Sequence, residues 1–296
     1  MSWAAAELDA LPLLTTAEAD VDRAQRVTFL LKQRFCYTYD GPVRDLDHRL
    51  VVIPRGRHGN ARRLHWRVGV SAANARSTTT RDRLGNIATR IRVSDVADSV
   101  CFEVAAVVQR VGPVVDARLP ARALDDPRLL RATRRTAADE AIRTVAHDHA
   151  CRDRRETVER LCAYVHRAIA YDFGATSVAT TAAEAHAGAR GVCQDSAHLM
   201  LALCRVLSIP ARYVSGHLLG EGGTHAWTEV VVRDGDGARA LAFDPCNGRR
   251  AGGGYLTVAV GRDYGDVPPT SGTYSGEAAG RLHATKRVGV TALVDH

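Results

Sequence analysis

The chain has 296 residues, of which 46% are hydrophobic and 25% charged, and its formal net charge is +7. This composition is typical of a globular protein with one large or two medium domains, and no apolar run approaches the roughly 20 residues that a membrane-spanning helix needs. Basic and acidic residues are interspersed along the chain without interleaved aromatic residues. We therefore expect neither a nucleic-acid partner nor a membrane partner.

The first segment, residues 1–25, is rich in Ala and Leu and lacks a clear period. It is expected to form a helix or a loose tail. It has no basic stretch followed by an apolar core, which is the pattern of a secretory signal. This N-terminus therefore favours a cytoplasmic location.

Residues 26–111 read as a series of short strands separated by turn signals. β-Branched and aromatic residues are frequent in these runs, and Asp40-Gly41-Pro42 is typical of a turn. The expected strands cover residues 27–39, 49–54, 64–70, 87–93 and 100–108. Short strands at this spacing predict an antiparallel β-sandwich. Residues 112–127, with three prolines, are expected to be a linker before a domain that spans residues 128–296.

Helical patterns follow the linker. Apolar residues recur at helical spacing over residues 137–149 and 157–170. The segment Thr180-Thr181-Ala182-Ala183-Glu184 has the pattern of a capping box and predicts a short helix that ends near residue 188.

Cys193 comes next, at the start of a further amphipathic run that Pro210 ends. A cysteine in the first turn of a helix lies beside free N–H groups and partial positive charge, which favour the thiolate and suit an oxyanion. Asp195 suits the same helix dipole, and we interpret it as structural, with Arg212 or Arg262 as its expected partner.

Two candidate partners for Cys193 lie on strands. His225 begins a β-rich run that also carries Trp227 and Glu229 on the same face, since side chains alternate along a strand. Asp234-Gly235-Asp236-Gly237 predicts a hairpin, and the next strand ends at Asp244. Neighbouring antiparallel strands would bring His225 and Asp244 together, so that the carboxylate orients the imidazole toward the thiol.

These runs resemble the bacterial transglutaminase-like (papain-like cysteine protease) superfamily. The resemblance rests on GVCQD at 191–195, SIPARYVSG at 208–216, HAWTEV at 225–230 and FDPCN at 243–247, and the run VGRDYGDVPP at 260–269 is also similar. The β-rich first third is similar to the N-terminal region that often precedes this domain in bacteria.

The resemblance implies an α+β fold in which a helix bundle bearing the cysteine packs on an antiparallel sheet bearing the histidine and the aspartate. It implies a Cys193–His225–Asp244 triad that forms a thioester on a protein or peptide amide, without a cofactor. Tyr171 or Gln194 is the expected additional oxyanion donor. Trp227 and Tyr264 are the expected substrate-binding residues.

Several alternatives stay open. The thioester is resolved either by water, as in a protease or amidase, or by an amine, as in a transglutaminase. A catalytically silent module that acts in binding or assembly is the alternative function.

The seven cysteines form no CxxC pair and predict reduced thiols. A zinc site is a rival interpretation, although the spacing of its candidates is unusual: Cys193, His198, Cys204, His225 and Cys246. Asp263 and Asp266, near Tyr264, indicate a site rim or a calcium-like cluster, of which the rim is favoured because no EF-hand spacing is present.

Overall fold

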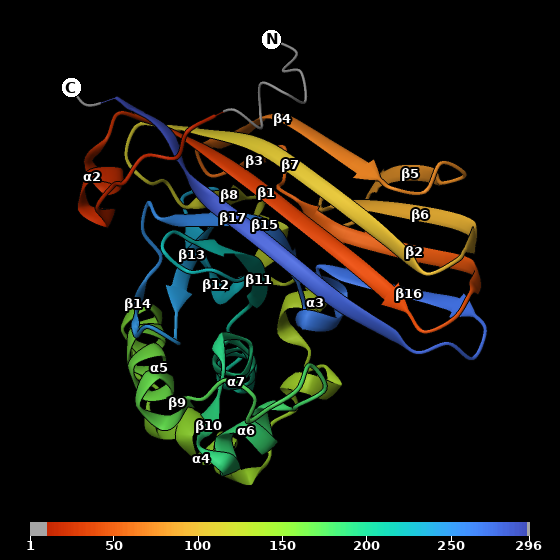
Figure 1. Ribbon diagram of the computed structural model, residues 1–296. Coiled ribbons are helices and arrows are strands. Elements are labelled where there is room, and N and C mark those ends of the chain that lie inside the picture. The colour runs from red at the N-terminus through yellow and green to blue at the C-terminus, as the bar shows by residue number, and fades with distance from the viewer. Residues whose placement is uncertain (1–10, 295–296) are drawn as a thin grey trace.

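The computed structural model describes residues 11–294. It has two parts, a β-sandwich and an α+β unit that lies below it in Figure 1. Both sheets of the sandwich are antiparallel. The first has the order β17 (Gly280–Val294), β1 (Arg26–Tyr39), β7 (Ser99–Val111), β4 (Ala61–Val70) and β3 (Arg57–His58). The second has the order β16 (Thr270–Ser275), β2 (Val43–Ile53), β6 (Ile87–Val96) and β5 (Arg76–Arg81).

Buried and exposed side chains alternate along these strands, which explains why the two sheets pack together. In β6, Ile91 and Val93 are buried while the alternate residues Arg90 and Arg92 are exposed. The inward side chains meet those of the other sheet in one apolar cluster, which includes Phe35, Leu50, Ile91 and Phe102. Burial of such side chains is the main stabilising contribution in a sandwich of this kind. The predicted β-sandwich is therefore confirmed.

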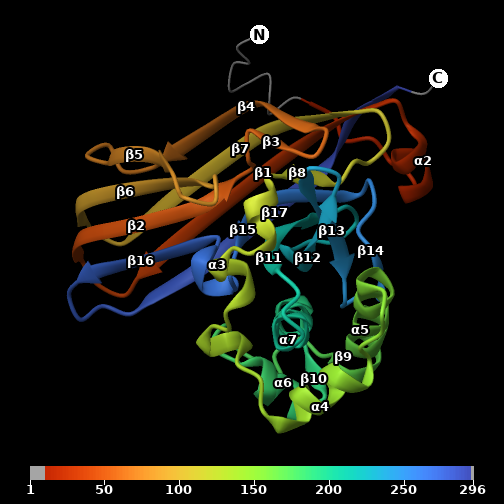
Figure 2. The same cartoon turned by 180° about the vertical axis from the view of Figure 1, so that it is seen from behind.

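The second part contains an antiparallel sheet whose members, in order, are β14 (Arg249–Arg250), β13 (Gly237–Asp244), β12 (His225–Asp234), β11 (Ala211–Leu218) and β15 (Tyr255–Gly261). β8 (Ala117–Leu119), from the expected linker, pairs with β13. The sandwich covers one face of this sheet and helices cover the other, as the view from behind shows (Figure 2). The predicted α+β class is confirmed by this arrangement.

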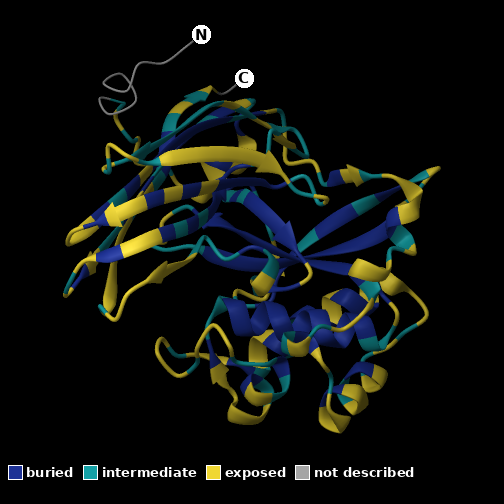
Figure 3. Cartoon of the chain, turned by 90° about the vertical axis from the view of Figure 1, so that its right-hand side faces the viewer, coloured by how far each residue is buried: buried dark blue, intermediate teal, exposed yellow. Residues whose placement is uncertain are grey.

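The helices surround α7 (Cys193–Val206), of which every residue from Gln194 to Arg205 is buried. Buried residues accordingly concentrate in the sheet and in this helix, while the helices around it expose their outer faces (Figure 3). The other helical segments are α2 (Glu18–Arg23), η1 (Ala121–Leu124), α3 (Pro127–Leu130), η2 (Arg134–Thr136), α4 (Glu140–Asp148), α5 (Arg154–Ala168), α6 (Ala182–Gly188) and η3 (Tyr264–Asp266). A short parallel pair, β9 (Ala170–Tyr171) and β10 (Arg190–Gly191), precedes α7. Within residues 11–294, no helix has the length and apolar character needed to cross a bilayer.

The ends of the chain differ from the expected domain limits. The second domain was expected to run to residue 296, but β16 and β17 are hydrogen-bonded members of the two sandwich sheets. The first 25 residues were expected to form a helix or a loose tail. Of these, residues 1–10 lie outside the described part, and α2 buries Val21 in the main apolar cluster. Strand pairing between the two ends of the chain is a long-range event that local patterns do not reveal.

The expectation that all cysteines are reduced is wrong for two of them, because Cys36 and Cys101 form a disulfide. They are register partners on β1 and β7, 65 residues apart in sequence. Five other cysteines are free: Cys151, Cys162, Cys193, Cys204 and Cys246. Facing positions on adjacent antiparallel strands bring two Cβ atoms close enough for this bond, and the spacing in sequence carries no such information.

Candidate active site

Cys193 is the first residue of α7, as the sequence predicts. The approach to the helix is tight: a Cβ atom on Gly191 would lie 2.6 Å from the Asp195 carboxylate, so a larger residue there would displace the first turn. The thiol is partly exposed. Because the first amides of a helix lack intrahelical acceptors, their N–H groups are available to a negative charge that develops beside Cys193.

Asp195 has a structural role, but its partners differ from those expected. Its Oδ2 accepts hydrogen bonds from the Val192 main-chain N–H at 2.8 Å and from the Thr176 hydroxyl at 2.6 Å. It thereby ties the start of α7 to the loop before α6. Arg212 pairs instead with Glu229, and Arg262 with Asp266.

His225 and Asp244 lie on neighbouring strands and meet at the same end of the sheet. β12 begins at His225 and β13 ends at Asp244, and the antiparallel register pairs Thr228 with Phe243. His225 Nε2 lies 2.7 Å from Asp244 Oδ2. Both side chains are almost completely buried, at 3% and 0% exposed. The predicted juxtaposition of these two residues is therefore present.

The Asp244 carboxylate is held by neutral donors around the imidazole. It accepts five hydrogen bonds, from His225 Nε2, the Tyr255 hydroxyl, Asn247 Nδ2 and the main-chain N–H groups of Cys246 and Asn247. Burial raises the pKa of Asp244, but the hydrogen bond and charge of His225 together with the other donors outweigh it, and the pKa is lowered. Asp244 is therefore an anion that fixes the orientation of the ring.

The other ring nitrogen of His225 faces the opening of the site. Nδ1 lies 3.1 Å from Glu221 Oε2, on the loop before β12. Burial lowers the pKa of His225, while hydrogen bonds to Asp244 and Cys193 and the charges of both groups raise it to about 10. The imidazole is therefore protonated at neutral pH, and it adjoins the thiol, an acidic side chain and a buried carboxylate.

Residues that the sequence interpretation missed complete this environment. Tyr255 and Asn247 hold Asp244, and Glu221 contacts His225. Asn247 and Glu221 had a weak signal, because each lies within four residues of a triad member. Tyr255 had none, because β15 joins the sheet next to β11 and reaches Asp244 only through the folded arrangement.

The two candidate oxyanion donors, Tyr171 and Gln194, both lie near Cys193 but differ in exposure. Tyr171, in β9, pairs in register with Gly191 and is 65% exposed. The Cys193 thiolate contributes to raising the pKa of Tyr171, after the larger effect of burial. Gln194 is buried, and its Nε2 donates to the Ser177 carbonyl at 3.4 Å. Tyr171 thus has the accessible position, and its oxyanion role stays a prediction.

The two expected substrate-binding residues lie away from an open surface. Trp227 is 1% exposed, and its ring packs against those of His225 and Tyr255, with centroids 6.2 and 5.4 Å away. Tyr264 is partly buried in η3, where its main-chain N–H donates to His198 Nε2. Their roles toward a substrate remain predictions, although Trp227 contacts the His225 ring.

The acidic residues beside Tyr264 are held within the protein. Asp263 Oδ1 accepts a hydrogen bond from the Gly265 main-chain N–H and lies 3.9 Å from Arg135. Asp266 forms an ion pair with Arg262 at 2.8 Å. Asp263 is therefore the N-cap of η3, and the Arg262–Asp266 salt bridge stabilises the same turn.

The rival zinc set does not converge on one point. Cys204 lies eleven residues after Cys193 in the same helix, which is about 16 Å along its axis. A zinc ion binds its ligands at about 2.0–2.3 Å, so one ion cannot bind both. Among residues 11–294, no group of three or more His, Cys, Asp or Glu side chains has a metal-binding arrangement.

Cys246 lies next to the site but has a different environment from Cys193. Burial raises its pKa to about 12, with smaller contributions from the Cys193 and Asp244 charges, and a hydrogen bond with Ser196 opposes the rise. Ser196 is one helical turn from Cys193. Cys246 is therefore an internal reference thiol near the site.

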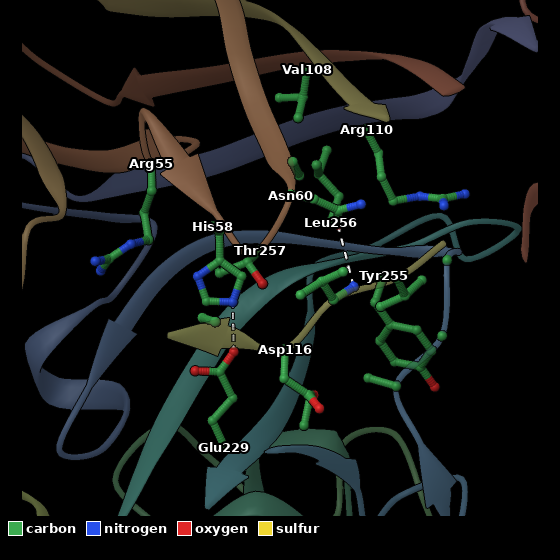
Figure 4. Close-up of a pocket in the computed structure, with 18 of the residues that line it drawn as sticks. Arg55, His58, Asn60, Val108, Arg110, Asp116, Glu229, Tyr255, Leu256 and Thr257 are labelled. Carbon is green, nitrogen blue, oxygen red and sulfur yellow. Dashed lines mark hydrogen bonds and ion pairs between the residues drawn. The ribbon is translucent and has the colours of Figure 1, made fainter. Parts of the chain in front are cut away.

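A cavity of about 70 Å³ lies at the junction of the sandwich and the sheet of the second part, and Trp227 and Tyr255 are among the residues that line it. Figure 4 shows His58 of β3 pointing at Glu229 of β12 across this junction, with Tyr255 nearby. His58 Nε2 lies 2.6 Å from Glu229 Oε1, and Arg212 holds the other carboxylate oxygen at 2.6 Å. The face of β12 that carries His225 therefore also carries a buried carboxylate that joins the two parts through His58.

Comparisons with known families agree with this architecture. The model of the transglutaminase-like superfamily core matches residues 143–245, and the model of the bacterial transglutaminase-like N-terminal region matches residues 30–109. The first match contains Cys193, His225 and Asp244, and the second covers most of the sandwich.

Similar proteins are of two kinds. Uncharacterized protein ML0607 of Mycobacterium leprae is 40% identical over 36% of this chain, and uncharacterized protein Mb2599c of Mycobacterium bovis is 34% identical over 40% of it. The matched part spans about two fifths of the length of these relatives. A crystal structure from Cytophaga hutchinsonii, described as a "putative cysteine protease", superposes with a TM-score of 0.73 at 21% identity, covering 90% of this chain and 91% of that one. This last likeness shows a shared fold over nearly the whole molecule.

Proposed function

We propose that this chain, a transglutaminase-like superfamily protein with a bacterial transglutaminase-like N-terminal region, is a thiol acyl-transfer enzyme that acts on protein or peptide amides. Cys193 is the nucleophile, His225 the acid and base, and Asp244 the residue that orients the ring. One observation carries the proposal: His225 has a buried carboxylate 2.7 Å from Nε2 and hydrogen-bonds Cys193 at the start of a buried helix.

The chemistry follows from the protonated state of His225. The imidazolium and the helix N-terminus stabilise the Cys193 thiolate, which attacks the carbonyl carbon of a carboxamide or peptide. The amides at the start of α7 stabilise the resulting oxyanion. His225 then gives its proton to the departing nitrogen, the C–N bond breaks and a thioester remains.

The second half of the reaction regenerates the enzyme. Neutral His225 accepts a proton from water or from an amine as that acceptor attacks the thioester carbonyl. The C–S bond breaks, and the thiolate and imidazolium form again. Water gives hydrolysis, as in a protease or amidase, and an amine gives transfer, as in a transglutaminase.

The test is the alkylation of Cys193 by iodoacetamide as a function of pH, measured by peptide mass spectrometry. We expect Cys193 to react faster than Cys246 well below pH 8, since Cys246 is a nearby thiol with a raised pKa. In His225→Ala, alkylation should rise only through about pH 8.5, as for an unassisted thiol.

The alternative function is a catalytically silent module used in protein binding or assembly. The contact between Glu221 and His225 Nδ1 favours it, because a carboxylate then occupies the position from which His225 would act. This alternative predicts that Cys193 and Cys246 react at similar rates in the wild-type protein, an outcome that contradicts the enzyme proposal.

The cellular location is also a proposal. The Cys36–Cys101 disulfide favours an oxidising compartment over the cytoplasm, because the cytosol keeps most thiols reduced. Counting thiols in acid-quenched protein from its native cells decides between them. Five free thiols support the oxidising compartment, and seven support the cytoplasm.

A further inference from the structure

Glu221 is placed where the second substrate of the proposed reaction must enter. Its Oε2 lies 3.1 Å from His225 Nδ1, the nitrogen that exchanges protons with the reacting groups, and its side chain is 42% exposed. Any acceptor that gives a proton to Nδ1 must come within hydrogen-bonding reach of that nitrogen. An acceptor in that position therefore lies beside the Glu221 carboxylate.

The loop that carries Glu221 leaves room for the carboxylate to move. Gly220, Gly222 and Gly223 surround it, and a Cβ atom built on any of them would have no neighbour within 4 Å. Gly220 has φ = +86°, a conformation that larger residues rarely adopt. His217 Nδ1 lies 3.1 Å from the Gly223 carbonyl and holds the end of this loop. The open space around the glycines still leaves room for the Glu221 carboxylate to leave His225 Nδ1 when another group arrives.

Other charges around the site have their own partners. Asp172, on the segment after Tyr171, pairs with Arg190 at 3.3 Å. Lys286 of β17 donates a hydrogen bond to the Thr224 hydroxyl at 3.4 Å, beside His225. Glu221 differs from these residues, because its ion-pair partner among residues 11–294 is the His225 imidazole itself.

The charge of this imidazole changes during the proposed reaction. In the resting enzyme the imidazolium neutralises Glu221, but after acylation its proton has left with the departing nitrogen. Glu221 is then an anion beside a neutral base and a thioester. A primary alkylammonium ion restores the missing positive charge, whereas water does not, and a hydrogen bond between two charged groups is stronger than one between neutral groups.

We propose that Glu221 selects a primary amine as the acyl acceptor, an inference that rests on the thiol acyl-transfer function proposed above. The ammonium group binds Glu221 in the acyl-enzyme and gives one proton to His225 Nδ1. The free amine attacks the thioester carbonyl, its second proton passes to water as the C–S bond breaks, and an amide forms. The Cys193 thiolate and the His225 imidazolium return together, and Glu221 regains its partner.

The experiment measures how the acyl-enzyme divides between two acceptors. p-Nitrophenyl acetate acylates Cys193, and the released p-nitrophenolate reports acylation. n-Butylamine, a cation at pH 7, and hydroxylamine, which is neutral at that pH, then compete for the acetyl group, and the two products are counted by mass spectrometry. The variants are Glu221→Gln and, as a matched change from carboxylate to amide, Asp172→Asn.

We expect Glu221→Gln to lower the butylamine-to-hydroxylamine product ratio about tenfold or more, because a charged hydrogen bond is lost. Asp172→Asn should leave the ratio within about twofold of wild type. Equal ratios in wild type and Glu221→Gln, with acylation intact, overturn the role of Glu221 alone. A wild-type protein that releases no p-nitrophenolate from Cys193 overturns the proposed function itself.

Discussion

Strand β12 contributes one residue to each of two histidine–carboxylate pairs that have similar geometry. At its start, His225 meets Asp244 at 2.7 Å, and four residues later Glu229 meets His58 at 2.6 Å. Both carboxylates are buried, at 0% and 1% exposed. Neither the distance nor the burial distinguishes the pair proposed to be catalytic from the other.

The remaining partners of each pair make the difference. Glu229 also binds the buried Arg212 guanidinium, so its carboxylate has partners on both oxygens and joins His58 of the sandwich to the sheet of the second part. Asp244 binds neutral donors besides His225, whose second nitrogen faces a thiol and an exposed loop. A histidine–carboxylate pair is therefore suited to catalysis when its free nitrogen meets a nucleophile at an accessible place.

The largest effect should come from Asp244→Asn. The amide keeps the shape of the carboxylate but removes the charge that holds the imidazolium, so we expect turnover of p-nitrophenyl acetate to fall about 10⁴-fold, as in other triads. Circular dichroism should show a folded protein. A loss below about tenfold would mean that Asp244 is merely a structural partner, like Glu229.

Glu229→Gln should act on stability instead. It leaves the Arg212 guanidinium buried without a counter-charge, and we expect a loss of about 3–5 kcal/mol in the free energy of unfolding. Urea denaturation measures this loss, and alkylation of Cys193 in the folded fraction should be unchanged. Unchanged stability would show that the junction does not depend on this ion pair.

His58→Gln should have a smaller effect at the same junction. Glu229 keeps Arg212 and loses one charged hydrogen bond, which typically contributes about 1.5–3 kcal/mol. The urea midpoint should fall between those of the wild type and Glu229→Gln. A loss equal to that of Glu229→Gln would instead assign most of the stabilisation to the His58 contact.

The smallest effect is in the pH dependence of stability, about 1 kcal/mol per pH unit for one proton. Burial opposes ionisation of Glu229, but Arg212 and His58 lower its pKa to about 2 from a usual 4.5. Its stabilisation is therefore present above pH 4.5 and is lost as the pH falls toward 2. The raised pKa of His225, about 10 against 6.5, gives the opposite sign: its contribution is complete below pH 6.5 and is lost as the pH rises through 10.

Melting temperatures from pH 3 to 10 test this contrast. Glu229→Gln should flatten the acidic limb alone, and His225→Ala should flatten the alkaline limb alone. If each variant altered both limbs equally, the two ends of β12 would form one coupled network rather than two separate ones.

Local sequence patterns determined the elements that carry the chemistry. The amphipathic run after Cys193 forms α7, and the Asp234–Gly237 segment connects β12 to β13. The Thr181–Glu184 capping box begins α6. Each of these features depends on residues a few positions apart, so backbone preference and apolar spacing suffice to specify it.

Only the tertiary structure decided which distant residues surround these elements. The Cys36–Cys101 bond, the return of β17 to the sandwich and the contact of Tyr255 with Asp244 all depend on strand register between separate parts of the chain. Register is set by the packing of whole sheets, which no short pattern encodes. The sequence by itself therefore determined the candidate triad, whereas packing decided how Glu221, Tyr255 and the sandwich enclose it.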